Sequence, residues 1–290
     1  ITCTMIILNP HQPRLLPLVS GGAINIIPVP LRRNDPSSPW CYAASLSPPI
    51  PLDDDDDDDS AVTLSPSSPT TTLMPPGSNF LATQVWPSSR VASNIVEQYM
   101  DPSWTVCELG CGPGLPSLTA AKSGARRVIA TDVDELALEM VRAAAGEQGF
   151  INNHNNITDE EWEKQRFVTK QFDLTSQDTS LPDADLYILS DVFESAAVAE
   201  GAAWHVQSLL SDNQKTIKCS SVRKKRDISR VWVFAQSDRA QRDGFLRKMR
   251  EWYDDEDGDR RHVGWTMDHA PDCDNELWLF DLDEGMVKYN

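Results

Sequence analysis

The chain has 290 residues, 40% of them hydrophobic, and a formal net charge of −18 at pH 7. This length suits one sizeable domain with additional segments. Such an acidic chain is a poor nucleic-acid binder, because neutralising phosphates requires a basic face. No apolar stretch reaches the roughly 18 residues without proline or charge that a membrane span requires, so we expect none.

Residues 1–79 differ in composition from the rest of the chain. They hold most of the 20 prolines, are rich in serine and threonine, and contain seven consecutive aspartates at 53–59. A segment of this composition buries too little apolar surface to offset its ordering entropy. We therefore predict a disordered leader over 1–79 and a folded domain over 80–290.

From residue 80 the pattern changes to alternating helices and strands. Helices are predicted from residue 87 onward and over 115–123, 135–145, 159–164, 195–210 and 239–253. Strands are predicted over 105–109, 127–131, 167–172, 185–189, 230–235, 263–267 and 277–282. Alternating units of this length predict a parallel sheet with helices on both faces. The expected fold class is α/β, a Rossmann-like doubly wound sheet of seven strands with an antiparallel last strand.

The cysteines and histidines indicate in which cellular compartment the protein works and whether it binds a metal. The six cysteines contain no CxxC pair, and Cys107 and Cys111 lie in an apolar strand and the glycine turn after it. We therefore expect a reduced, cytoplasmic protein. Targeting to an organelle by the N-terminal segment, or to the nucleus by the basic run 223–226, is the alternative. The five histidines show no ligand spacing, so we expect no metal site.

Three alternating glycines follow the first predicted strand of the domain: Gly110, Gly112 and Gly114. Missing side chains allow a tight turn from strand into helix and let a ligand approach the main chain. Asp132 ends the next strand, where a carboxylate can accept hydrogen bonds from a ribose diol. The combination predicts a nucleotide-type cofactor site at the carboxyl edge of the sheet.

Two cofactor classes share this layout. A dinucleotide site favours G-x-G-x-x-G, whereas this chain has G-x-G-x-G, with Leu115 in the place of the last glycine. Glu108, two residues before the first glycine, disfavours an anionic pyrophosphate and suits a ligand that carries an ammonium and a sulfonium. The pattern therefore favours S-adenosylmethionine, with an NAD-type dehydrogenase as the second choice.

Several segments of residues 80–285 resemble one family. They are Gln-Val-Trp86-Pro-Ser-Ser-Arg, Glu108-Leu-Gly-Cys-Gly-Pro-Gly-Leu-Pro-Ser, Ala-Thr-Asp132 and Ile-Leu-Ser-Asp191-Val-Phe. They are similar to class I S-adenosylmethionine-dependent methyltransferases, and among these to the methyltransferase-like group related to protein lysine methyltransferases, often called nicotinamide N-methyltransferase-like.

The resemblance implies roles for individual residues. The methionine half of the cofactor would be lined by Glu108, Gly110, Gly112 and Gly114. Asp132 would hold the ribose, Asp173 would lie near the adenine amino group, and Trp86 and Asp191 would face the reactive end and the substrate mouth. Asp132 is not expected to cap the following helix, whereas Asp134 is.

The acceptor side departs from the family. Many members have Asp-x-x-Tyr or Asp-x-x-Phe after the fourth strand, whereas this chain reads Asp191-Val-Phe193-Glu194. Trp86 and Phe193 would give cation–π contacts to an ammonium, Asp191 or Glu194 would supply charge, and Glu194 could help to remove a proton. Purely structural alternatives are packing of Trp86 under the first helix, an ordinary loop acid at Asp173 and a solvated helix-start charge at Glu194.

The function expected from these features is methyl transfer from S-adenosylmethionine to a protein side chain, most simply lysine. Related arginine-directed enzymes also carry an Asp-Val-Phe run, so the acceptor stays open. We expect a monomer with a protein substrate and without nucleic-acid or membrane partners. The alternatives are a small-molecule N-methyltransferase, a redox enzyme on the same type of sheet, and a catalytically silent binding module.

Overall fold

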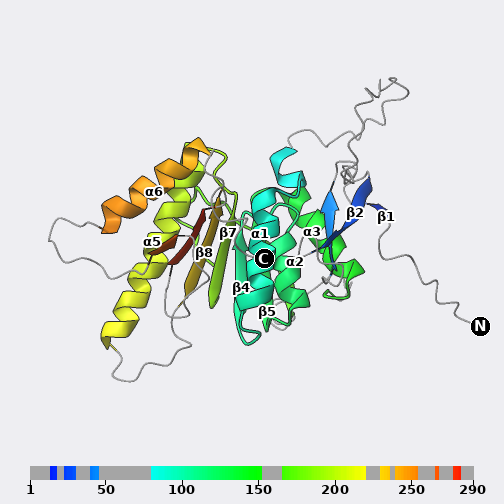
Figure 1. The fold of residues 1–290 in the computed structure, drawn as a ribbon, viewed down its shortest axis with the longest axis horizontal. Helices are drawn as coiled ribbons and strands as arrows, with labels where there is room; N and C mark the ends of the chain where they lie inside the picture. The colour runs from blue at the N-terminus through cyan, green and yellow to red at the C-terminus, as the bar shows by residue number, and fades with distance from the viewer. Residues whose placement is uncertain are drawn as a thin grey trace, which may run out of the picture.

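The structure of the protein is a computed structural model that describes residues 14–17, 23–30, 40–45, 80–151, 165–219, 229–235, 239–253, 265–267 and 277–281. These residues form two sheets and the helices packed on the larger one (Figure 1). Within these ranges, no helix combines the length and the apolar character that crossing a bilayer requires.

The larger sheet has the strand order β6-β5-β4-β7-β8-β10-β9. The strands are β4 (Thr105–Leu109), β5 (Arg127–Asp132), β6 (Phe167–Gln171), β7 (Leu186–Ser190), β8 (Arg230–Ala235), β9 (Trp265–Met267) and β10 (Leu277–Asp281). The five strands β4 to β8 pair in parallel, and their apolar runs are buried because helices cover both faces. The chain order reverses between β4 and β7, and ligands bind at such a switch point in open α/β sheets.

The α/β Rossmann-like class is confirmed, but the predicted sheet is wrong in its last part. The structure supports a core of five parallel strands, β4 to β8, and beyond it β10 also pairs in parallel with β8, Leu277 opposite Val231 and Asp281 opposite Ala235. β9 is parallel to β10 as well. A seven-stranded sheet with an antiparallel last strand is therefore not what forms. The apolar alternation that identifies a strand is the same in both chain directions, so it carries no information on orientation.

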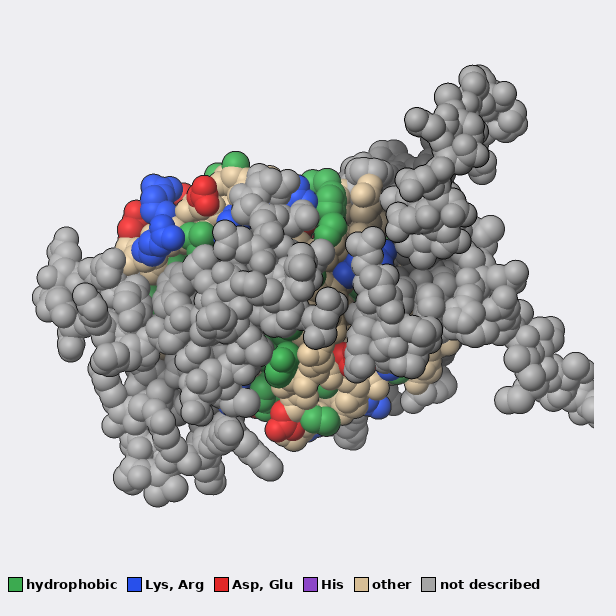
Figure 2. Space-filling model, viewed as in Figure 1, with side chains coloured by type: hydrophobic (Ala, Val, Ile, Leu, Met, Phe, Trp, Pro, Cys, Tyr) green, Lys and Arg blue, Asp and Glu red, His purple; other side chains and the backbone are tan. Residues whose placement is uncertain are grey.

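Two helical layers sandwich the sheet (Figure 1). The helices are η1 (Phe80–Thr83), α1 (Pro87–Tyr99), α2 (Leu115–Lys122), α3 (Glu135–Glu147), α5 (Ala196–Cys219) and α6 (Ala240–Tyr253). One core cluster joins α1, α2 and α3 to strand residues such as Val106 and Ile188. The other joins α5 and α6 to the alternate strand residues, such as Cys107 and Leu189. The outer side of α6 carries charged side chains of both signs (Figure 2).

The segment predicted to be disordered contains three strands, so that part of the expectation is corrected. β1 (Arg14–Pro17), β2 (Ala23–Pro30) and β3 (Trp40–Ser45) form a second, antiparallel sheet. Cys41 and Ala43 of β3 are fully buried in the core cluster of α2 and α3, and Cys41 Sγ donates a 3.5 Å hydrogen bond to Gln148 Oε1. Composition averaged over 79 residues hides short apolar runs that become stable only by packing on a partner surface.

Most predicted elements of the domain coincide with observed ones. The strands predicted over 105–109 and 230–235 have the observed bounds, and the helix predicted over 195–210 continues to Cys219. The helix predicted over 159–164, the acidic run 53–59 and the basic run 223–226 lie outside the described residues. The domain boundary near residue 80 stays a prediction.

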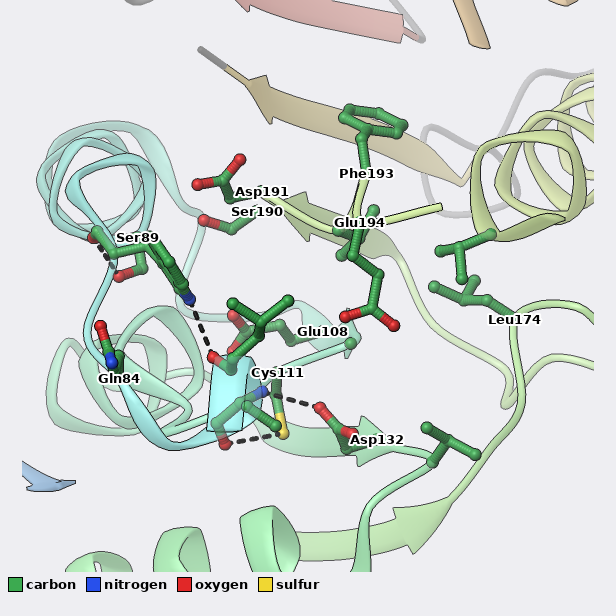
Figure 3. Close-up of a pocket in the computed structure, with 18 of the residues that line it drawn as sticks. Gln84, Ser89, Glu108, Cys111, Asp132, Leu174, Ser190, Asp191, Phe193 and Glu194 are labelled. Carbon is green, nitrogen blue, oxygen red and sulfur yellow. Dashed lines mark hydrogen bonds between the residues drawn. The ribbon is translucent and has the colours of Figure 1, made fainter. Parts of the chain in front are cut away.

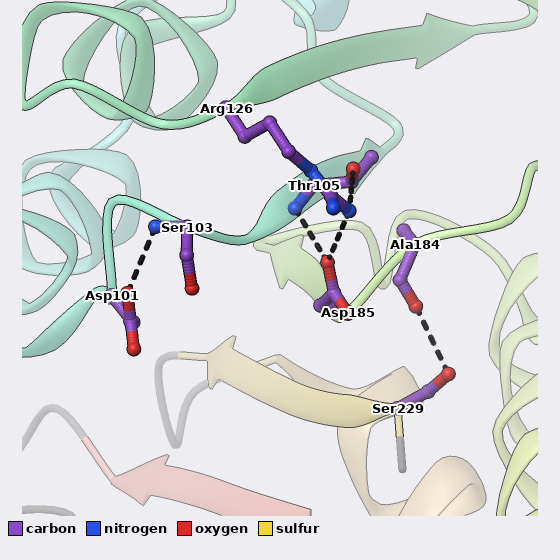
Figure 4. Close-up of polar contacts among 7 residues, drawn as sticks. All are labelled: Asp101, Ser103, Thr105, Arg126, Ala184, Asp185 and Ser229. Atoms are coloured by element: carbon purple, nitrogen blue, oxygen red, sulfur yellow. Dashed lines mark hydrogen bonds and ion pairs between the residues drawn. The ribbon is translucent and has the colours of Figure 1, made fainter. Parts of the chain in front are cut away.

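Polar contacts connect neighbouring strands at their amino-terminal ends (Figure 4). Asp185 Oδ2 accepts hydrogen bonds from the Thr105 backbone N–H at 2.7 Å and from Arg126 Nη2 at 3.0 Å. Ser229 Oγ donates to the Ala184 carbonyl at 3.0 Å. These contacts tie the starts of β4, β7 and β8 together, which leaves the opposite, carboxyl edge for a ligand site.

Candidate functional site

A cavity of about 410 Å³ opens at the carboxyl edge of the sheet (Figure 3). Its wall includes most of the predicted site residues: Trp86, Glu108, Gly110, Gly112, Asp132, Asp173, Asp191, Phe193 and Glu194. Gly114 is not part of the lining; it is the N-cap of α2. The topology therefore brings the ends of β4, β5, β6 and β7 together with η1 and the start of α6.

The glycine turn requires glycine for reasons of space and backbone angle. Gly112 has φ +48°, its N–H donates to Asp132 Oδ2 at 2.8 Å, and a Cβ there would lie 3.3 Å from the Ala82 carbonyl oxygen. Gly114 has φ +68°, and its Cβ would lie 2.7 Å from Val141 Cγ2 on α3. The left-handed region strongly disfavours other residues, so the turn keeps the main chain open to the cavity and lets α2 pack on α3.

Glu108 presents a buried carboxylate with one unsatisfied oxygen. The residue is 1% exposed, and its Oε2 accepts hydrogen bonds from the Ser117 N–H at 2.9 Å and from Ser117 Oγ at 2.5 Å. Oε1 is buried and has no hydrogen-bond partner among the described residues. Burial raises the pKa of Glu108 to about 8, with a further contribution from the charge of Asp132 and an opposing one from Ser117. A buried acceptor without a donor is costly, and a ligand ammonium would satisfy it.

Asp132 links the glycine turn to the start of the next helix. Its Oδ2 accepts from the Gly112 N–H and its Oδ1 accepts from the Asp134 N–H at 2.9 Å. Burial raises its pKa, and the charges of Asp134 and Glu194 act in the same direction. Each carboxylate oxygen can accept a second hydrogen bond, so the side chain can also receive a diol. The prediction that Asp134 caps α3 is confirmed, since its side chain accepts from the Leu136 N–H at 2.9 Å.

The far end of the cavity combines an acid with an apolar surface. Asp173 is exposed, and its Oδ1 accepts from the N–H and Oγ1 of Thr175 at 2.8 and 2.7 Å, which closes a turn after β6. Val133 lines the same end and is 52% exposed. An apolar side chain beside polar groups is typical of a surface that receives a planar ring. Our sequence analysis missed Val133, although a bulky aliphatic residue between two acids after a strand was a readable signal.

The acceptor side contains an ion pair that the sequence analysis did not anticipate. Arg239 donates from Nε to Asp191 Oδ1 at 3.0 Å and from Nη2 to Asp191 Oδ2 at 3.1 Å. Its Cζ lies 5.0 Å from the ring centroid of Trp86. The Asp191 side chain is 1% exposed, so its charge is compensated inside the protein and is not presented to an incoming ammonium. Arg239 directly precedes α6 after β8, and residues that follow a parallel strand meet at this edge.

Phe193 takes a different position from that predicted, whereas Glu194 lies in the wall of the cavity. Phe193 is 2% exposed and packs against Phe245 at 5.1 Å between ring centroids, so its ring belongs mainly to the core below α6 and contributes little surface to the cavity. Glu194 is exposed, and its carboxylate is directed toward Asp132 (Figure 3). It therefore adds negative charge to the same half of the cavity as Asp132.

Comparison with known proteins supports a methyltransferase fold. A family model described as ribosomal protein L11 methyltransferase (PrmA) matches residues 74–175. The ribosomal protein L11 methyltransferase of Thermotoga maritima is 40% identical over 65 residues, which cover 22% of this chain and 24% of that protein. Its counterpart from Listeria welshimeri is 26% identical over 147 residues, 49% of this chain and 44% of that protein. A solved ribosomal protein L11 methylase from Lactobacillus delbrueckii is 18% identical, with a TM-score of 0.31 over 42% of this chain and 52% of that one.

The matches cover one part of the molecule. The chain spans less than half the length of these curated relatives, and the family model ends at residue 175, before Asp191. The matched residues contain the glycine turn, Asp132 and Asp173. The narrower resemblance to nicotinamide N-methyltransferase-like proteins is not confirmed by these matches. The fold is that of the class I S-adenosylmethionine-dependent methyltransferases, and its cofactor half is similar to that of ribosomal protein L11 methyltransferases.

Proposed function

We propose that the protein is an S-adenosylmethionine-dependent methyltransferase that acts on a nitrogen of a protein side chain, most simply lysine. The observation that carries the proposal is the buried Oε1 of Glu108 beside the glycine turn, which no described residue pairs with. A cationic donor placed there would satisfy the oxygen and stabilise the ionised carboxylate. The pyrophosphate of a dinucleotide would instead disfavour the ionised carboxylate, so it would gain no such stabilisation.

The remaining cavity residues fit the other parts of this cofactor. Asp132 has acceptor capacity for the two ribose hydroxyls, and Val133 offers an apolar surface for the adenine ring. Asp173 lies at the same end and is proposed as the acceptor for the adenine amino group. Asp132 and the exposed Glu194 add carboxylates to the cavity wall, and Glu108 becomes charged when a cationic ligand favours its ionised form, so the cavity favours a ligand that carries positive charge.

For this reaction the protein mainly has to align the methyl donor with the acceptor; it need not supply a nucleophile of its own. When bound, the cofactor would supply a methyl carbon made electrophilic by the sulfonium: an acceptor nitrogen would bond to this carbon in line as its bond to sulfur breaks, and S-adenosylhomocysteine would leave as the neutral thioether. The chain holds the donor at the glycine turn, excludes water with the segment around Trp86, and positions the acceptor. An amine acceptor has to lose a proton before it reacts, and exposed Glu194 is the carboxylate proposed to receive it.

Residues at the end of β7 are proposed to contact the methyl acceptor. Ser190 lines the cavity beside Asp191 (Figure 3), and its buried Oγ has no hydrogen-bond partner among the described residues. It can hydrogen-bond an incoming nitrogen, a role that Asp191 cannot take while it is paired with Arg239. The relatives' names specify a ribosomal protein as acceptor, which supports a protein substrate. Lysine as the methylated residue and a cytoplasmic location are proposed from the sequence pattern alone.

Calorimetric titration tests the cofactor. S-adenosylhomocysteine should bind the purified chain and NAD should not, and Gly112→Arg and Asp132→Ala should each abolish or strongly weaken binding. Asp178→Asn, on an exposed loop away from the cavity, is the matched control and should bind as the unchanged protein does. Equal binding by the Gly112→Arg protein would show that the assigned pocket is wrong.

The acceptor is tested separately. The protein is incubated with methyl-labelled S-adenosylmethionine and a native lysate, and labelled bands are identified by mass spectrometry. We expect label on lysine of a protein, reduced in the Ser190→Ala and Glu194→Gln variants. Label on a metabolite would favour a small-molecule N-methyltransferase. A chain that binds the cofactor and labels nothing would instead be a binding module.

A further inference from the structure

One wall of the cavity is a short segment that precedes α1. Leu81, Ala82, Gln84 and Trp86 all line the cavity. Ala82 approaches the glycine turn so closely that its carbonyl oxygen would lie 3.3 Å from a Cβ on Gly112. Trp86 Nε1 donates to the Leu81 carbonyl at 2.9 Å, so the segment is folded back on itself. It therefore lies across the cofactor turn as one unit, which we call the Trp86 wall (residues 81–86).

The Trp86 wall is continuous with α1 at one end. Ser89 donates from its N–H and its Oγ to the Trp86 carbonyl at 3.1 and 2.7 Å, which fixes the backbone where the helix begins. These contacts hold the main chain of Trp86. The indole ring is held within the segment by its hydrogen bond to Leu81, and from outside the segment by Arg239 at the start of α6, whose Cζ lies 5.0 Å from the ring centroid.

Asp191 fixes the orientation of Arg239. The Asp191 backbone has φ +57°, and its N–H donates to the Phe234 carbonyl at 2.9 Å, so the residue is anchored to β8. Its two carboxylate oxygens bind one edge of the guanidinium. A planar guanidinium can form this fork and present its face to an aromatic ring at the same time, whereas the ammonium of lysine lacks the fork.

We propose that Arg239 is a positioning residue that holds the Trp86 wall against the cofactor cavity and thereby slows the release of the cofactor. The chain of contacts runs from the rigid sheet through Asp191 and Arg239 to the indole of Trp86, and from there to the segment on the glycine turn. The inference rests on the proposed function for the identity of the ligand. It assigns a role in cofactor retention to a residue that lies more than 60 positions beyond the part matched by the family model.

The test measures the dissociation rate of S-adenosylhomocysteine from the full chain by stopped-flow displacement. Arg239→Met keeps the length of the side chain and loses both contacts, so release should be about three- to tenfold faster, as expected for a partly desolvated cation–π contact. Arg239→Lys retains the positive charge, so its dissociation rate should lie between those of the unchanged protein and of Arg239→Met. Arg247→Met removes an exposed arginine of the same helix and should leave the rate unchanged.

A double-mutant cycle separates positioning from general destabilisation. If Arg239 acts through Trp86, Arg239→Met should accelerate release in the unchanged background and should have little further effect in a Trp86→Ala background. Additive effects of the two substitutions, or an unchanged rate in Arg239→Met, would overturn the inference. If circular dichroism shows that Arg239→Met does not fold, the same cycle with Arg239→Lys decides.

The same experiment distinguishes this inference from the proposed function. A chain that does not bind S-adenosylhomocysteine at all contradicts the proposed cofactor and, with it, the ligand of this inference. A chain that binds it with identical release rates in all variants leaves the cofactor in place and overturns only the role of Arg239.

Discussion

Ser117 donates two hydrogen bonds to a single carboxylate oxygen of Glu108 and leaves the other oxygen buried, without a donor in the part of the chain that the structure describes. Ser117 lies in the first turn of α2, so the helix that follows the glycine turn orients the acid that precedes it. The arrangement fixes one oxygen and directs the other to the ligand. It costs stability in the free protein, and ligand binding would return that energy.

The pKa of Glu108 makes cofactor binding a proton-release reaction. Because burial raises this pKa to about 8, the group is mostly protonated near pH 7 in the free protein. A ligand ammonium favours the ionised form, so binding S-adenosylhomocysteine at pH 7 should release close to one proton. Calorimetry in buffers of different ionisation enthalpy measures this number. Glu108→Gln should bind about tenfold or more weakly and show no release from this site; equal release in both proteins would contradict the assignment.

The same shift predicts how stability changes with pH. The unfolded chain loses the Glu108 proton near its ordinary pKa of 4.5, whereas the folded chain loses it near 8. The folded state therefore holds more protons between these values, and the contribution of Glu108 to the free energy of unfolding falls as pH rises through that window. Urea unfolding at pH 5 and pH 8 should show a smaller decline for Glu108→Gln than for the unchanged protein. A decline of the same size would assign the pH dependence to other groups.

Asp132 and Glu108 are expected to bind different parts of one ligand. Asp132→Asn keeps an oxygen for the Gly112 N–H but loses the charge that receives the diol, so S-adenosylhomocysteine should bind about ten- to a hundredfold more weakly. 5′-Methylthioadenosine, which has the ribose but no amino-acid part, separates the two residues. Its affinity should fall in Asp132→Asn and stay unchanged in Glu108→Gln. If its affinity instead fell in Glu108→Gln and stayed unchanged in Asp132→Asn, the ribose of the cofactor would lie at Glu108 and the amino-acid part at Asp132.

Much of the cofactor half could be predicted from the sequence, because its signals are local. The strand, the glycine turn and Asp132 lie within 28 consecutive residues, and each residue type follows from backbone geometry. The partner of Asp191 could not be predicted, since Arg239 lies 48 residues away and meets it only because β7 and β8 are neighbours. The direction of β10 and the packing of β3 on α2 and α3 also depend on tertiary contacts that single-strand patterns do not encode.

Phe193 shows how a motif can carry the right residue type in a different role. Its ring is buried against Phe245, so Phe193→Ala should lower the free energy of unfolding by about 3 kcal/mol. The affinity for S-adenosylhomocysteine should change little at temperatures where the variant is folded. Urea unfolding and calorimetry measure the two quantities. A large loss of affinity with unchanged stability would restore the predicted position at the mouth of the cavity.

Gly114 allows a test of the fold that is independent of the ligand. Gly114→Ala places a Cβ 2.7 Å from Val141 Cγ2 at φ +68°, so it combines backbone strain with overpacking and should cost about 3 kcal/mol. Gly149 has φ +72°, and beyond its two chain neighbours no described atom lies within 4 Å of its Cβ position, so Gly149→Ala should cost only the backbone part, about 1 kcal/mol. Adding Val141→Ala should relieve the overpacking in Gly114→Ala, so the cost of the double variant should be smaller than the sum of the two single costs. If Gly114→Ala and Gly149→Ala are equally destabilised, the close approach of α2 to α3 at this glycine is not present in solution.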